Sequence, residues 1–162
     1  MIVSCDGASR GNPGPAGFGV SITDPDGSVV EEIARGIGVA TNNVAEYTAA
    51  IEGLRRAAEL GASEVLLRSD SRLLIEQLSG RFRVKNPTLQ RLHAEARSLA
   101  KSFRVVRYEH VPRERNTEAD RLANLGVDEW LAAGGATRPQ TESATPLWEE
   151  ESGRSRSPDG SG

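Results

Sequence analysis

The sequence predicts an α/β domain built on a five-stranded mixed sheet flanked by helices. Short apolar runs alternate with longer segments in which apolar residues recur at helical spacing. Their order along the chain is three strands, a helix, a strand, two helices, a strand and a last helix. Helical crossovers connect parallel strands and tight turns connect antiparallel ones, so this order indicates a mixed sheet.

Three strands open the chain. The first covers Ile2–Cys5 and ends at Asp6, and a segment dense in glycine and proline, GASRGNPGPAG, follows it as an irregular loop. The second covers Phe18–Thr23, and the third covers Ser28–Gly38. Between these two, Asp24–Gly27 has the composition of a tight turn, which predicts an antiparallel hairpin.

From Thr41 the apolar period becomes that of a helix, which ends at Gly61. Either Thr41 or Asn42 can cap its start, and Glu46 then lies near the positive end of the helix dipole. The same criteria predict a strand, a short helix, a longer helix, a strand and a last helix in the rest of the domain. These elements cover 65–67, 71–78, a segment from Pro87, 103–111 and a segment from Asn116.

This pattern predicts one domain over residues 1–133. Residues 134–162 are rich in Gly, Ser, Thr, Pro and Glu, which is typical of a disordered tail or a linker. The net charge of the chain is −3, so no global basic field indicates a nucleic-acid partner. Binding of a nucleic acid therefore depends on where individual Arg and Lys side chains lie.

Cysteine content and hydropathy exclude several classes of protein. Cys5 is the single cysteine, so the chain has no internal disulfide and no cysteine-based zinc site. No apolar run approaches the roughly 20 residues of a membrane span, and the start of the chain lacks the features of a signal peptide. We therefore expect a cytoplasmic protein, and we expect it to be a monomer.

Four acidic residues are expected where a strand ends or a helix begins: Asp6, Glu46, Asp70 and Asp120. Taken singly, each has a plain structural explanation as a turn residue, a helix cap or a first-turn acid. Taken together, they can converge at the edge of the sheet where open α/β proteins bind ligands. Carboxylates gathered there repel one another unless a cation holds them, which indicates a divalent-metal site and phosphate chemistry.

The segments around these acids are DGASRGNPGPAGFG, ATNNVAEYTAAIEGL, SDSRLLIEQLSG and VPRERNTEADRLAN. In this order and spacing, from about Ile2 to Leu131, the chain resembles type 1 ribonuclease H. The resemblance implies the ribonuclease H-like fold with strand order 3-2-1-4-5. It also implies endonucleolytic cleavage of the RNA strand of RNA–DNA hybrids, giving 5′-phosphate and 3′-hydroxyl ends. The chain is most similar to the compact bacterial and archaeal kind, because residues 80–86 connect two helices where other members insert a basic protrusion.

The resemblance implies that the four carboxylates bind two Mg²⁺ ions, with Mn²⁺ able to substitute. In that assignment Asp6 bridges both ions, Glu46 and Asp70 hold the ion on the nucleophile side, and Asp120 completes the ion on the leaving-group side. Two such ions about 4 Å apart can clamp the attacking and the leaving oxygen of an in-line displacement.

A further catalytic residue is expected in the segment before the last helix. His110 lies ten residues before Asp120, a spacing at which some family members carry a histidine that assists product release or protonates the leaving group. Arg113 is the alternative, since an arginine there would neutralise developing phosphate charge without titrating. A structural role at the end of a strand is a third explanation for His110.

Substrate-binding residues are implied by the same resemblance. Asn12 and Asn43, with the backbone of Ser9 and Gly11, match positions near the RNA minor groove, where the 2′-hydroxyl distinguishes RNA from DNA. A second group, Thr41, Asn42 and Asn86, matches positions that bind a phosphate of the DNA strand. Helix capping by Thr41 or Asn42, and turns at Asn86 and Asn12, are the structural alternatives.

Two other functions stay open at this level. A domain of the same fold could bind hybrid or double-stranded RNA without cleaving it, although the presence of all four carboxylates argues against that alternative. Some actinobacterial-type relatives carry a similar N-terminal domain fused to a phosphatase, and the polar segment 134–162 resembles an interdomain linker. The partner expected in every case is a nucleic acid duplex, above all an RNA–DNA hybrid.

Overall fold

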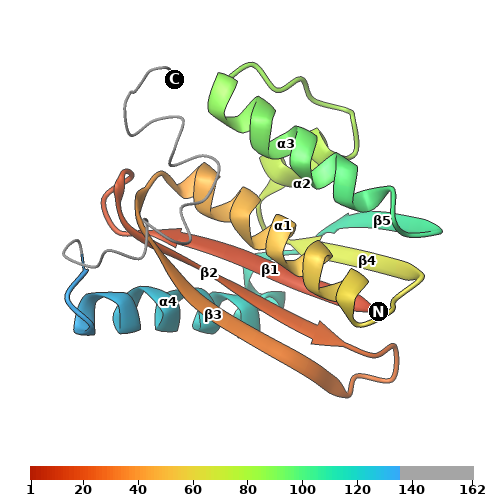
Figure 1. Cartoon of the computed structure of the whole chain (residues 1–162), viewed down its shortest axis with the longest axis horizontal. Helices are drawn as coiled ribbons and strands as arrows, with labels where there is room; N and C mark the ends of the chain where they lie inside the picture. The colour runs from red at the N-terminus through yellow and green to blue at the C-terminus, as the bar shows by residue number, and fades with distance from the viewer. Residues whose placement is uncertain (136–162) are drawn as a thin grey trace.

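The computed structural model describes residues 1–135, in which a five-stranded sheet is flanked by four α-helices (Figure 1). The elements in chain order are β1 (Ile2–Ser9), β2 (Gly14–Thr23), β3 (Val29–Ala40), α1 (Asn42–Glu59), β4 (Glu64–Ser69), α2 (Arg72–Leu78), α3 (Pro87–Ala100), β5 (Val105–His110), the 3-10 turn η1 (Arg113–Arg115) and α4 (Thr117–Ala132). The predicted order of strands and helices along the chain is confirmed. The predicted tail lies outside the described residues from position 136 onward.

The strands are ordered β3-β2-β1-β4-β5 across the sheet, as predicted. β1, β2 and β3 pair antiparallel, whereas β4 pairs parallel with both β1 and β5. The parallel ladder between β1 and β4 is short and ends at the pair Ser4 and Arg68. Beyond that pair the two strands are no longer paired, and Asp6 and Asp70 both lie past the end of this ladder.

The prediction for the first loop was wrong at both ends. β1 continues through Asp6 to Ser9, and β2 already begins at Gly14, so most of the segment expected to be irregular is paired strand. The backbone N–H of Arg10 donates to the carbonyl of Pro15 at 2.9 Å and closes the connection. Asp6 therefore lies inside a strand rather than at its end, although it does lie past the end of the parallel ladder.

The sheet is covered by α1, α2 and α3 on one face and by α4 on the other (Figure 1). α1 crosses β1 and β2, and its buried side includes many small residues, which let the helix lie close to the strands. The main core fills the space between this face and the three helices. Its fully buried large side chains include Phe18, Tyr47, Leu54, Leu67 and Leu92.

On the opposite face, α4 packs against β2 so closely that only glycine fits beneath it. A Cβ atom on Gly19 would overlap the carbonyl oxygen of Ala119 and the backbone nitrogen of Ala123. Within the glycine-rich segment that was interpreted as a loop, Gly7 makes room for α1, whereas Gly17, like Gly19, lies against α4. This close contact holds the first turn of α4, and with it Asp120, against the sheet.

We predict that Gly19→Ala lowers the free energy of unfolding by about 1–3 kcal/mol, because the added methyl overpacks the contact between β2 and α4. Urea denaturation measures this change. Val29→Ile is the matched control, since it adds one methylene at a position that is 59% exposed on β3 and should change stability by less than about 0.5 kcal/mol. Equal effects of the two substitutions would contradict the close packing described here.

Candidate active site

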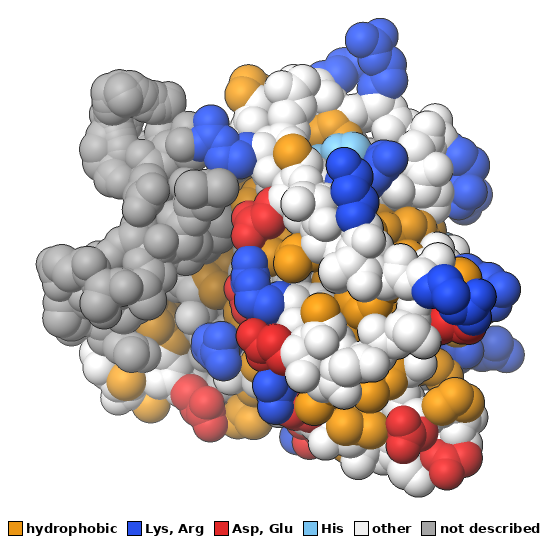
Figure 2. Space-filling model, turned by 45° about the vertical axis from the view of Figure 1, so that its right-hand side comes forward, with side chains coloured by type: hydrophobic (Ala, Val, Ile, Leu, Met, Phe, Trp, Pro, Cys, Tyr) orange, Lys and Arg blue, Asp and Glu red, His pale blue; other side chains and the backbone are white. Residues whose placement is uncertain are grey.

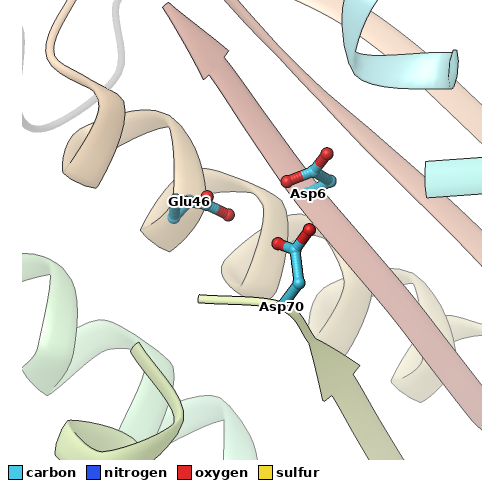
Figure 3. A group of neighbouring side chains, drawn as sticks. All are labelled: Asp6, Glu46 and Asp70. Carbon is cyan, nitrogen blue, oxygen red and sulfur yellow. The ribbon is translucent and has the colours of Figure 1, made fainter. Parts of the chain in front are cut away.

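Three carboxylates from three separate elements converge on one point. Asp6 lies on β1, Glu46 on α1, and Asp70 directly after β4, and Figure 3 shows their side chains directed toward one another. One carboxylate oxygen from each lies within 4.8 Å of the others. Asp6 and Glu46 are each only 5% exposed, so this group is held largely out of water.

The backbone of Gly7 holds two of these acids together. Its N–H donates to Asp6 Oδ1 and to Glu46 Oε1, each at 3.0 Å. A Cβ atom at this position would overlap the backbone of Ala45 and Glu46, so glycine is what allows α1 to touch β1 here. Glu46 is the fifth residue of α1, beyond its first turn, and it is therefore positioned by this contact rather than by the helix dipole.

Asp120 reaches the same place from the other side of the sheet. It lies in the first turn of α4 and is close enough to Asp6 for the two carboxyl groups to share a hydrogen bond when one is protonated. The buried Asn116 fixes this end of the helix, because its Nδ2 donates to the carbonyl of Cys5 at 3.0 Å, one residue before Asp6. The group of three within 4.8 Å does not include Asp120, which borders it.

Burial and mutual repulsion shift the protonation of the cluster. Burial, followed by the charge of Asp70, raises the pKa of Asp6 to about 8. Burial and then the charge of Asp6 raise the pKa of Glu46 well above its usual value. Burial also raises the pKa of Asp70, and the positive charge of Arg113 partly offsets this effect. These acids therefore resist ionisation together unless positive charge is supplied among them.

A pocket of about 410 Å³ opens over the four acids. It is strongly polar, and it is bordered by two arginines as well as the carboxylates. The residues that line it are Asp6, Gly7, Ala8, Ser9, Arg10, Asn42, Glu46, Asp70, Arg113, Asp120 and Asn124. Cationic groups at the rim and acidic groups at the floor suit a ligand that carries both negative charge and metal ions.

A second pocket, of about 440 Å³, lies next to the first around the start of α1 and α3. Its polar side chains are those of Asn12, Thr41, Asn43, Asn86 and Thr88. Asn12 connects the two pockets, because its Oδ1 accepts a hydrogen bond of 2.8 Å from the backbone N–H of Asn42. Thr41 caps α1 by accepting from the N–H of Val44, and Asn86 caps α3 in the same manner.

Comparison with known proteins identifies the group to which this arrangement belongs. A family model described as reverse transcriptase-like matches residues 4–126. The N-terminal RNase H domain of Rv2228c from Mycobacterium tuberculosis has a similar structure, with a TM-score of 0.77 and 52% identity over 78% of this chain and 98% of that one. The chain belongs to the ribonuclease H family.

Other ribonuclease H relatives agree with this placement. LC11-RNase H1, solved in complex with an RNA/DNA hybrid, has a TM-score of 0.77 and 41% identity over 80% of this chain and 98% of that one. Ribonuclease HI of Halobacterium salinarum is 46% identical over 124 residues, which are 76% of this chain and 62% of that protein. The full-length Rv2228c, a bifunctional protein, matches over 35% of its length, so the chain spans about a third of this relative.

Within this ribonuclease H domain, the residues predicted for substrate contact divide between the two pockets. Ser9 and Asn42 line the carboxylate pocket, whereas Asn12, Thr41, Asn43 and Asn86 line the second one. Gly11 lines neither pocket and has a φ of 123°, a left-handed conformation that favours glycine. Of the two capping candidates for α1, Thr41 is the one that caps the helix, whereas Asn86, for which a turn was the alternative, caps α3. Both side chains still line the second pocket.

The two candidates for a further catalytic residue are placed differently. Arg113 lines the carboxylate pocket from the turn η1 and acts on Asp70 through its charge. His110 lies at the end of β5, exposed to solvent, and its charge also reaches Asp70. It is not among the residues that line the pocket.

The sequence-based prediction missed four residues that line the ribonuclease H pocket: Gly7 and Ala8 on β1, and Arg10 and Asn124. Asn124 could have been found, since it follows Asp120 by four residues and so lies on the same face of the helix. Arg10 gave no such signal, because it lies in the segment that was interpreted as an irregular loop. Along residues 1–135, no helix has the length and apolar character needed to cross a bilayer.

We predict that the metal-free protein becomes less stable as the pH rises from about 4 to about 8. These carboxyl groups ionise near pH 4 in the unfolded chain, whereas the pKa of Asp6 in the folded protein is about 8. The unfolded chain therefore binds fewer protons in this window, so the free energy of unfolding falls as the pH rises. Urea denaturation in EDTA at pH 5 and pH 8 measures the difference.

Asp70→Asn should reduce this pH dependence and raise the stability at pH 8, because it removes one of the repelling charges. Glu118→Gln, at an exposed position of α4, is the matched control and should leave the slope unchanged. A wild-type protein that is more stable at pH 8 than at pH 5 in EDTA would show that the cluster is not strained by its own charge.

Proposed function

We propose that the chain is a ribonuclease H that hydrolyses the RNA strand of RNA–DNA hybrids. The observation that carries this proposal is the convergence of Asp6, Glu46 and Asp70 within 4.8 Å, with Asp120 at their border, in a member of this family. Relatives that carry the name ribonuclease H, and the hybrid complex of LC11-RNase H1, support the choice of substrate.

The donor set fits a hard divalent cation. All four groups are carboxylates, and oxygen ligands of this kind suit Mg²⁺, with Mn²⁺ as a substitute. Asp6, Glu46 and Asp70 would hold one ion, and Asp6 with Asp120 would hold a second. When bound, such ions neutralise the developing charge on the attacking and leaving oxygens of the phosphodiester. The raised pKa of Asp6 and of Glu46 supports this assignment, because cations would restore their ionised forms.

Other residues in and around the pocket would act on the RNA strand. Arg113 lies beside Asp70, where its permanent charge would neutralise the scissile phosphate in the transition state. His110, exposed at the end of β5, would protonate the departing oxygen or help the product leave. Ser9 and Asn42, which line the pocket, and Gly11 in the turn after β1 would contact the RNA strand.

The second pocket is suited to the DNA strand and the minor groove. Thr41 and Asn86 stand at the first turns of two helices, where backbone N–H groups and the positive ends of helix dipoles favour a phosphate. Asn12 and Asn43 line this pocket, and their amides would pair with base edges and 2′-hydroxyls. The fixed spacing of the two pockets would then select a duplex with one ribose strand.

Local contacts in these two pockets must supply the affinity for the hybrid. Figure 2 shows the Lys and Arg side chains of one face in several separate groups, with acidic and apolar side chains between them. On the face that Figure 2 shows, the described residues form no continuous basic track for a duplex, which agrees with the net charge of −3. We therefore expect binding that is more dependent on the polar pockets, and less dependent on salt, than binding by a strongly basic protein.

The first test is a digest of three labelled duplexes with Mg²⁺ or Mn²⁺: an RNA–DNA hybrid, double-stranded RNA, and DNA with a single ribonucleotide. We predict cleavage of the hybrid, and a loss of about 10³-fold or more in Asp70→Asn, since several kcal/mol of charge stabilisation depend on the metal ligands. Glu118→Gln, an exposed acid on α4, should keep the wild-type rate. Undiminished cleavage by Asp70→Asn would overturn the assignment, and tight hybrid binding without cleavage by the wild type would favour a binding module.

A second test separates the two candidate catalytic residues. We predict that Arg113→Ala lowers kcat by about 10²-fold or more, because its charge acts at the pocket. His110→Ala should lower kcat less at neutral pH, because this side chain stands outside the pocket lining. Single-turnover and steady-state rates, measured on the same hybrid, distinguish chemistry from product release. A larger loss at His110 in single-turnover cleavage would reverse the two roles.

A further inference from the structure

A chain of hydrogen bonds connects the turn after β1 to the fourth carboxylate. Arg10 Nη1 lies 2.9 Å from Asp128 Oδ1, and its Nη2 donates to Asn124 Oδ1 at 3.2 Å and to the carbonyl of Asn124 at 3.4 Å. Asn124 Nδ2 in turn donates to the carbonyl of Asp120 at 3.0 Å and faces Asp120 Oδ1 at 3.5 Å. Arg10, Asn124 and Asp120 all line the carboxylate pocket.

The chemistry of arginine fixes which groups donate and which accept along this series of hydrogen bonds. A guanidinium group has only donors, so the amide of Asn124 must present its oxygen to Arg10. The amide nitrogen is then directed toward Asp120, where its two hydrogens can serve the carbonyl and the carboxylate of that residue. Without Arg10, the amide could turn over and place its oxygen against the carboxylate, which would be repulsive.

Asp120 needs such a partner more than the other three acids do. Gly7 holds Asp6 and Glu46 through backbone hydrogen bonds, and Asp70 follows directly from β4. Asp120 instead comes from a helix on the other face of the sheet and borders a group that repels it. A donor fixed beside its carboxylate offsets part of this repulsion and limits the rotamers that the side chain can adopt.

We infer that Arg10 and Asn124 are positioning residues that orient Asp120 for binding of the metal ion it shares with Asp6. This role rests on the hydrolase function proposed above, since it concerns the same site. Neither residue needs to touch the substrate. The ion pair between Arg10 and Asp128 connects the outer end of this hydrogen-bond network to the next turn of α4.

A direct contact between Arg10 and an RNA phosphate is the competing role for this side chain, which is 41% exposed. The two roles make different predictions. Loss of a phosphate contact weakens hybrid binding and leaves metal binding intact. Loss of a positioning contact weakens metal binding and leaves hybrid affinity intact when it is measured without metal.

The test uses the full chain with Arg10→Ala, Asn124→Ala, the double variant, and Arg121→Ala as a matched control on the exposed side of α4. Three quantities are measured: the increase in Tm of the metal-free protein on titration with Mn²⁺, the Mg²⁺ concentration for half-maximal cleavage, and hybrid affinity in EDTA. We predict that each single variant weakens metal binding roughly 10-fold, as is typical of partners that orient metal ligands, with hybrid affinity unchanged. The double variant should lose no more than the stronger single variant, because the two residues act in series.

The outcomes separate this inference from the proposed function. If the wild type cleaves the hybrid, and Arg10→Ala has the same metal dependence as Arg121→Ala, the positioning role is overturned and the function stands. Weaker hybrid binding with unchanged metal dependence would assign Arg10 to the substrate and also overturn it. A third outcome is that the wild type cleaves no hybrid but shows a rise in Tm with Mn²⁺, and that both single variants lose this rise. This outcome would support the positioning role and reject the function.

Discussion

The central constraint on this domain is that it must hold like charges close together at a site that is largely buried from water. Asp6 and Glu46 are almost fully buried, and with Asp70 they offer oxygens within 4.8 Å of one another. Such an arrangement opposes folding in the absence of cations, so the surrounding framework must be rigid enough to hold it. The short parallel ladder between β1 and β4, and the contact of α1 with β1 at Gly7, supply that rigidity.

The two faces of the sheet contribute differently to the site. α1 brings Glu46 and the second pocket from one face, whereas α4 brings Asp120 from the other, and Asp6 on the strand between them belongs to both. Both helices lie close to the sheet because glycine leaves room for them, at Gly7 under α1 and at Gly19 under α4. Because the two helices lie so close to the strands, α1 brings Glu46 to Asp6 and Asp70, and α4 brings Asp120 to the border of this group.

Much of this could be predicted from the sequence. Periodicity and turn composition gave the element order, and the four acids with their flanking segments gave the family and the strand order that the structure confirms. The ends of β1 and β2 could not be predicted, because glycine and proline favour loops locally, whereas here Gly7 makes room for α1 and Gly17 makes room for α4. Arg10 was missed for a related reason. Its contact with Asn124 joins residues 114 positions apart and depends on how α4 lies across the sheet.

The four acids are spread from position 6 to position 120, so the site comes into being only when nearly the whole domain has been assembled. Contacts of such long sequence separation form late, since the intervening chain must first be ordered. A nascent or truncated chain that ends before α4 has at most three of the acids and none of the contacts that hold the fourth. A chain without α4 keeps the group of Asp6, Glu46 and Asp70 but lacks the fourth carboxylate, so the complete site depends on α4 being packed on the sheet.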